Sequence, residues 1–120
     1  MYRTSLSAGL LVAVIGFAPA ISAEPDLAQG KALYERHCTA CHGEGGDGKG
    51  EAERYLSPKA RDFTAGVFKF RSTPSGSPPT DEDLYRTARR GVSGTSMPSF
   101  DRLSEQELIS VIAYVKSFSD

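Results

Sequence analysis

The residues with the clearest chemical potential lie in one short segment, HCTACH at residues 37–42, which holds both cysteines and both histidines of the 120-residue chain. Two cysteines this close can form a disulfide, a redox-active dithiol, part of a zinc site or a pair of thioethers. A disulfide leaves the adjacent His42 without a role, and a redox dithiol is expected in a βαβ context. Four zinc ligands within six residues cannot easily close a tetrahedron.

The fourth chemistry, covalent attachment of haem c, uses the whole C-x-x-C-H pattern. Cys38 and Cys41 are three residues apart. On a helical turn their side chains share one face, where they can reach the two vinyl groups on one edge of a porphyrin. His42 follows directly and can ligate the iron. We therefore predict one haem c, attached through Cys38 and Cys41 by thioether bonds, with His42 as the proximal ligand.

The second axial ligand follows by elimination. Met97 is the only methionine besides Met1, and it lies in GVSGTSMPSF at residues 91–100. Glycines allow this loop to approach a ring closely, and Pro98 fixes the backbone beside the methionine. His37 lies on the same local segment as the cysteines and cannot reach the opposite face, so we predict it as a surface histidine. With two axial ligands the iron has no open site, which predicts electron transfer rather than catalysis. A lone methionine can also simply fill a core.

These features together resemble the small class I c-type cytochromes of bacteria, over about Asp26 to Phe118. The segment ARDFTAGVFKFRST at residues 60–73 is similar to periplasmic cytochrome modules of this type. The resemblance implies an all-α cytochrome c fold, with three to four helices and glycine- and proline-rich loops around one haem. It supports His42 and Met97 as axial ligands. It also implies that the carbonyl of Pro58 accepts a hydrogen bond from the second ring nitrogen of His42.

Further haem contacts can be predicted from residue type. Haem propionates need donors, and Arg61 and Arg71 are the candidates, with the hydroxyls of Tyr55 or Ser72 as further options. Each arginine can instead be an ordinary surface charge. The pocket itself is predicted to be lined by the aromatic residues of the middle segment, Phe63, Phe68 and Phe70.

Three helices are predicted from capping signals and periodicity. The first runs over about residues 26–38, with Asp26 as N-cap and Gly30 where another helix crosses closely. The second runs from Thr80 to about Arg90 and delivers the chain to the Met97 loop. The last begins after Ser104, which opens a capping box.

The segments between these helices predict irregular structure. Five glycines in residues 43–50 give a G-x-G-G-x-G spacing, but no strand precedes it and no Lys-Ser/Thr follows, which disfavours a phosphate loop. Residues 68–71 could form a short strand.

Residues 1–23 have the parts of a secretory signal peptide: Arg3, an apolar run and small residues before Ala20 or Ala23. We predict cleavage near Ala23, a single cytochrome domain over residues 24–120 and a periplasmic location. The alternative is an uncleaved membrane anchor.

The partners implied are redox proteins, as electron donor and acceptor. A free shuttle and a subunit of a larger respiratory enzyme are the two alternatives. A formal net charge of −1 disfavours nucleic acid. Arg89, Arg90 and Arg102 predict a basic docking patch near the Met97 loop. A haem gas sensor or small peroxidase is the alternative function, and a monomer is the default state.

Overall fold

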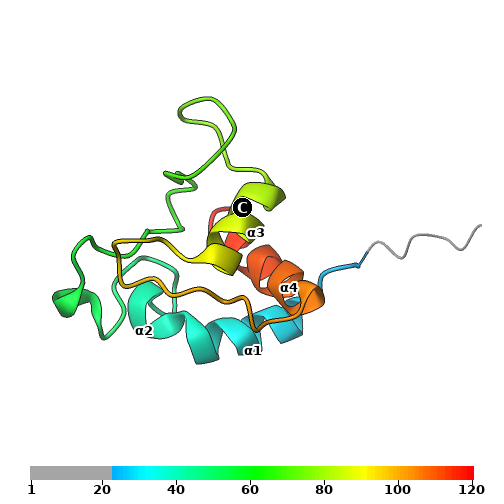
Figure 1. Ribbon diagram of the computed structural model, residues 1–120, viewed down its shortest axis with the longest axis horizontal. Coiled ribbons are helices and arrows are strands. Elements are labelled where there is room, and N and C mark those ends of the chain that lie inside the picture. Colours follow the sequence, from blue (N-terminus) through cyan, green and yellow to red (C-terminus); the bar gives the residue numbers. More distant parts are fainter. Residues whose placement is uncertain (1–22) are drawn as a thin grey trace, which may run out of the picture.

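The computed structural model describes residues 23–120, so the predicted signal peptide lies, apart from Ala23, outside the described residues. This part of the chain is all-α (Figure 1). Its elements are α1 (Leu27–His37), α2 (Thr39–His42), the 3-10 turn η1 (Glu53–Tyr55), α3 (Asp81–Arg90) and α4 (Glu105–Lys116). The predicted helical fold is confirmed. Residues 68–71 form no strand, and across residues 23–120 no helix has the length and apolar character needed to span a bilayer.

The three long helices begin at their predicted caps. The Asp26 carboxylate accepts the N–H of Gln29 at 3.0 Å at the start of α1. Capping boxes open α3 at Thr80 and α4 at Ser104, where side chain and backbone satisfy each other across the first turn. Because these signals are local, they fix the helix starts independently of how the helices pack.

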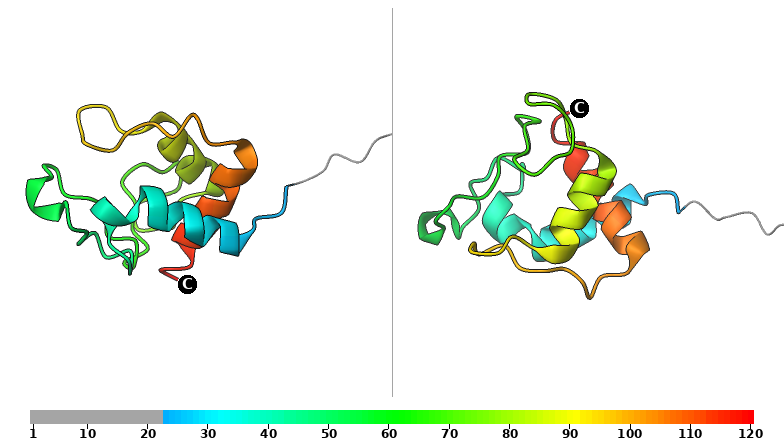
Figure 2. Two further views of the ribbon diagram at one scale, coloured as in Figure 1. Left: turned by 90° about the horizontal axis from the view of Figure 1, so that it is seen from below. Right: turned by 45° about the horizontal axis from the view of Figure 1, so that its top comes forward.

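Helices α1 and α4 cross, as Figures 1 and 2 show, and they approach closely at Gly30. A Cβ on Gly30 would lie 2.1 Å from the carbonyl oxygen of Ser110, so only glycine permits this approach. The crossing is also tied by a hydrogen bond, in which the N–H of Asp26 donates to the buried Ser110 hydroxyl at 3.0 Å. The close crossing predicted at Gly30 is confirmed, and it is the main contact between the two ends of the domain.

One hydrophobic core joins α1, α3, α4 and the segment that connects η1 to α3. Its buried members are Leu33, Tyr34, Phe63, Phe68, Leu84, Val111 and Ile112. Two phenylalanines of this core come from irregular chain, so the connecting segment is held by burial of its aromatic rings rather than by secondary structure.

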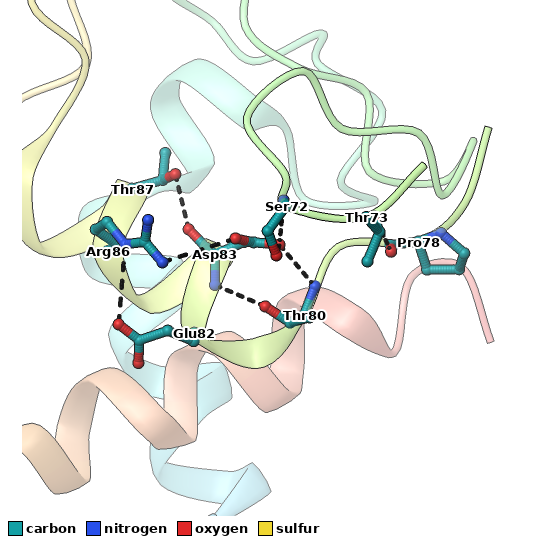
Figure 3. A network of polar contacts seen from close by, with 8 residues as sticks. All are labelled: Ser72, Thr73, Pro78, Thr80, Glu82, Asp83, Arg86 and Thr87. Atoms are coloured by element: carbon teal, nitrogen blue, oxygen red, sulfur yellow. Dashed lines mark hydrogen bonds and ion pairs between the residues drawn. The ribbon is translucent and has the colours of Figure 1, made fainter. Parts of the chain in front are cut away.

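A polar network fastens the loop at residues 72–80 to the start of α3 (Figure 3). The buried Asp83 carboxylate accepts the N–H of Ser72 at 2.8 Å, the Ser72 hydroxyl at 3.0 Å and the N–H of Thr80 at 3.0 Å. The backbone N–H of Ser72 is the main reason that the pKa of Asp83 falls to about 2, with the N–H of Thr80 adding to the effect. Asp83 therefore stays ionised and holds this loop at neutral pH.

Candidate functional site

A large cavity, of about 460 Å³, lies between the core helices and the loops that follow α2 and α3. This volume is typical of cofactor sites, which span roughly 300–1,000 Å³. The wall contains side chains from α1, α3 and α4 together with the segments at residues 56–70 and 92–100. Its ionisable side chains besides His37, His42 and the cysteines are Lys59, Arg61 and Lys69, and no carboxylate from residues 23–120 lines it. The cavity is thus mainly apolar, and the charged side chains in its wall are basic.

Cys38 and Cys41 both line this cavity, and neither forms a disulfide. Cys38 is the C-cap of α1, and the N–H of Cys41 donates to its carbonyl oxygen at 3.2 Å, which places the two thiols one turn apart. Burial, with a smaller effect of Cys41, raises the pKa of Cys38 to about 11. Reactive dithiols have lowered thiol pKa values, so the raised value disfavours redox-dithiol chemistry.

A zinc site also finds no support. Over residues 23–120, no group of three or more His, Cys, Asp and Glu side chains lies close enough to hold a metal ion. His37 and His42 flank the cysteine pair in sequence.

The His42 ring is fixed at its Nδ1 atom, which lies 3.0 Å from the carbonyl oxygen of Arg61. A carbonyl can only accept, so Nδ1–H donates and Nε2 keeps its lone pair for a metal. This corrects the expectation for Pro58: the accepting carbonyl belongs to Arg61, while Pro58 lies in the cavity wall. The chain turns back at the glycine loop, where the N–H of Phe63 donates to Gly46 at 2.7 Å, and this brings Arg61 alongside His42.

The plane of the same imidazole is set by Phe63. The two rings stack with centroids 4.3 Å apart and an interplanar angle of 16°. Burial lowers the pKa of His42, against the opposing effect of the Arg61 hydrogen bond. His42 is therefore neutral at physiological pH, which is the form that ligates metals.

Met97 lines the cavity from the segment between α3 and α4, drawn in yellow and gold in Figure 1. This loop leaves α3 at Gly91, whose φ is +67° and whose missing Cβ would lie 2.6 Å from the carbonyl carbon of Pro98. Only glycine fits at position 91, because other residues rarely adopt this positive φ and because a Cβ would collide with the Pro98 backbone. This contact holds the two ends of the loop together on either side of Met97.

The remaining candidate contacts divide into two groups. Arg61, Phe63, Phe68 and Phe70 line the cavity. Arg71 does not line it: its guanidinium donates instead to the carbonyl oxygens of Phe68 at 2.7 Å and Pro74 at 3.2 Å. The hydroxyl options are also elsewhere, since Tyr55 is 75% exposed and Ser72 binds Asp83.

Sequence reasoning missed Lys59 and Lys69 as cavity residues, and it treated His37 only as a surface residue. His37 is exposed but also lines the cavity, with its ring edge-to-face with Phe100 at 6.0 Å between centroids. The signal for Lys69 was its place between two phenylalanines, Phe68 and Phe70, which both line the cavity.

The residues present fit a haem c group. Two thiols one turn apart, a neutral imidazole with a fixed tautomer and a thioether sulfur line one apolar cavity. The basic wall residues match the carboxylates of such a group, and no acidic side chain opposes them. When bound, haem supplies one-electron redox chemistry at its iron.

The fold and the site together define a small c-type cytochrome. The chain matches the family described as cytochrome C oxidase, cbb3-type, subunit III, over residues 25–115, and it belongs to this family.

The solved structures similar to the chain include the following two. A chain of the Kuenenia stuttgartiensis reducing HAO-like protein complex Kustc0457/Kustc0458 is 48% identical with a TM-score of 0.76, covering 82% of this chain and 44% of that one. The chain therefore spans less than half the length of that relative. The KustC0563 c-type cytochrome is 25% identical with a TM-score of 0.53, covering 76% of this chain and 98% of that one. No curated protein matches the chain.

Proposed function

We propose that this cytochrome carries single electrons between redox protein partners through one haem iron ligated by His42 and Met97. The observation that carries the proposal is the convergence of two ligand types on one cavity. His42 comes from α2 with Nε2 left to bind, and Met97 comes from the loop beyond α3. An imidazole and a thioether are the axial pair of electron-transfer haems with raised potentials.

The proposed ligation separates an electron carrier from a haem catalyst. With both axial positions filled by the protein, no position is left for oxygen or peroxide to bind. A gas sensor or small peroxidase needs Met97 to be displaced. We therefore propose that the protein is not an enzyme.

The attachment and location follow from the sequence. One C-x-x-C-H motif accounts for one haem, held by thioether bonds from Cys38 and Cys41. Covalent attachment of haem c in bacteria takes place outside the cytoplasmic membrane, and the signal-like segment at residues 1–23 supports export. We propose a periplasmic protein that is cleaved near Ala23.

Optical spectra of the exported protein, oxidised and reduced with dithionite, test this function. We expect a low-spin c-type spectrum and a weak sulfur-to-iron band in the near infrared, which Met97→Ala abolishes. A c-type spectrum without the band would contradict Met97 ligation and favour an open-site sensor or peroxidase. No haem spectrum at all would contradict the whole assignment.

The docking surface is proposed to lie beside the Met97 loop. Arg89 and Arg90 end α3 and are exposed, and the loop is bound there, since the Ser99 hydroxyl donates to the carbonyl oxygen of Arg89 at 2.8 Å. Arg102, also exposed, follows the loop. We propose that this basic patch meets an acidic surface on the partner. One similar structure is described as a protein complex, which supports redox partners within a larger assembly.

Charge reversal tests the patch. Arg89→Glu with Arg90→Glu is expected to slow electron transfer with an acidic partner at low salt by roughly tenfold or more and to flatten the salt dependence. Lys31→Glu with Arg36→Glu on α1 changes the net charge equally and serves as the control. Equal rates and equal salt dependence in both double variants would overturn the docking proposal.

A further inference from the structure

The loop that carries Met97 is closed by its own hydrogen bonds. The N–H of Val92 donates to the carbonyl oxygen of Met97 at 3.2 Å, and the N–H of Thr95 donates to the carbonyl oxygen of Val92 at 3.1 Å. The residues between them, Ser93, Gly94 and Ser96, are exposed. Packing therefore contributes little to this stretch, and its conformation depends on a few polar contacts.

Thr95 makes the contact that reaches Met97 from inside this loop. Its hydroxyl donates to the carbonyl oxygen of Val92 at 2.7 Å and accepts the backbone N–H of Met97 at 3.2 Å. Both backbone polar groups of Met97 are thus satisfied within the loop, the N–H by Thr95 and the carbonyl by Val92. Without the hydroxyl, the Met97 N–H has no partner among the described residues.

We propose that Thr95 is a positioning residue for the axial methionine, and that its hydroxyl sets how readily the Met97 sulfur leaves the iron. This inference rests on the proposed ligation by Met97. The contacts at Gly91 and at Arg89 hold the ends of the loop, whereas Thr95 holds the backbone of the ligand itself. Loss of the hydroxyl leaves the fold intact and loosens one residue.

The experiment compares Thr95→Val, Thr95→Ser and Thr73→Val in the haem-loaded protein. Valine removes the hydroxyl with little change in shape, and serine restores it. Thr73 lies outside the cavity wall, and its hydroxyl also donates to a loop carbonyl, that of Pro78, at 2.7 Å. It therefore controls for the loss of one loop hydrogen bond elsewhere. The measurements are the rate of carbon monoxide binding to the reduced protein and the thermal midpoint of the near-infrared band.

For Thr95→Val we expect carbon monoxide binding roughly three- to tenfold faster, the effect of one net hydrogen bond. We also expect the band to disappear below the temperature of global unfolding. Thr95→Ser and Thr73→Val should match the parent protein. A Thr95→Val protein with parental rate and midpoint, or a Thr95→Ser protein as fast as Thr95→Val, overturns this inference. A parent protein that lacks the band overturns the proposed ligation instead.

Discussion

The two sides of the cavity that supply the proposed ligands are built differently. His42 is held by contacts between segments distant in sequence: its Nδ1–H binds the carbonyl of Arg61, and its ring stacks on the buried Phe63. Met97 is held by hydrogen bonds within its own loop, from Val92 and Thr95. One ligand packs against the buried Phe63 of the core, and the other belongs to a loop whose neighbouring residues are exposed.

This difference determines under which conditions each proposed ligand, His42 or Met97, can move out of its place in the cavity. Phe63 also contacts Tyr34, Phe68 and Phe118 through its ring, so the His42 side is lost only when the core is lost. The Met97 loop can open while the helices remain folded, because its hydrogen bonds are local. The same exposed loop lies beside the basic residues proposed to meet a partner.

The largest expected effect comes from truncating the aromatic support of His42. Phe63→Ala leaves a void in the core, where it is 9% exposed, and should lower the free energy of unfolding by about 3–5 kcal/mol. Chemical denaturation followed by circular dichroism measures this. Tyr55→Ala, at a 75% exposed position, should change stability by no more than about 0.5 kcal/mol. Equal losses of unfolding free energy in Phe63→Ala and Tyr55→Ala would contradict the conclusion that packing on the core holds His42.

A smaller effect is expected at the helix crossing. Gly30→Ala places a Cβ against the backbone of Ser110 and should cost about 1–3 kcal/mol. Gly45→Ala is the matched control, because no atom lies within 4 Å of its added Cβ. In thermal melts of Gly30→Ala, the near-infrared band should disappear together with helical structure. A near-infrared band whose midpoint fell in Gly30→Ala while the helices kept their parental midpoint would contradict the separation of the two sides.

The smallest effect concerns acid stability through Asp83. Its pKa is lowered from 3.8 to about 2, so its contribution to stability is complete above about pH 5 and is lost as the pH falls through 2. Asp83→Asn should therefore be less stable than the parent protein at neutral pH, with the difference shrinking toward pH 2. Urea denaturation at several pH values measures this. A difference that stayed constant down to pH 2 would show that the ionised carboxylate does not anchor the loop. The near-infrared band at neutral pH should be unchanged.

The sequence predicts the local parts of this molecule well. Helix starts at Asp26, Thr80 and Ser104 follow from side chains that cap the nearest N–H groups, and the crossing follows from Gly30 on the packed face of its helix. The attachment motif could be read directly because its chemistry is contained in five consecutive residues. These features depend on neighbours in sequence.

The features that the sequence did not predict depend on neighbours in space. Every residue has a carbonyl, so no residue type marks Arg61 rather than Pro58 as the acceptor for His42. Arg71 was expected at the cofactor, but backbone carbonyls in its own loop lie within its reach and accept its hydrogen bonds. The packing of the glycine loop against residues 60–63 decides which carbonyl faces His42.

The most direct test of the proposed ligation by His42 and Met97 is X-ray absorption at the iron edge of the oxidised and reduced protein. Ligation by His42 and Met97 predicts one sulfur neighbour of the iron in both states, lost in Met97→Ala and kept in Thr95→Val at neutral pH. A first shell with no sulfur in the parent protein, or a sulfur that persists in Met97→Ala, would contradict ligation by His42 and Met97.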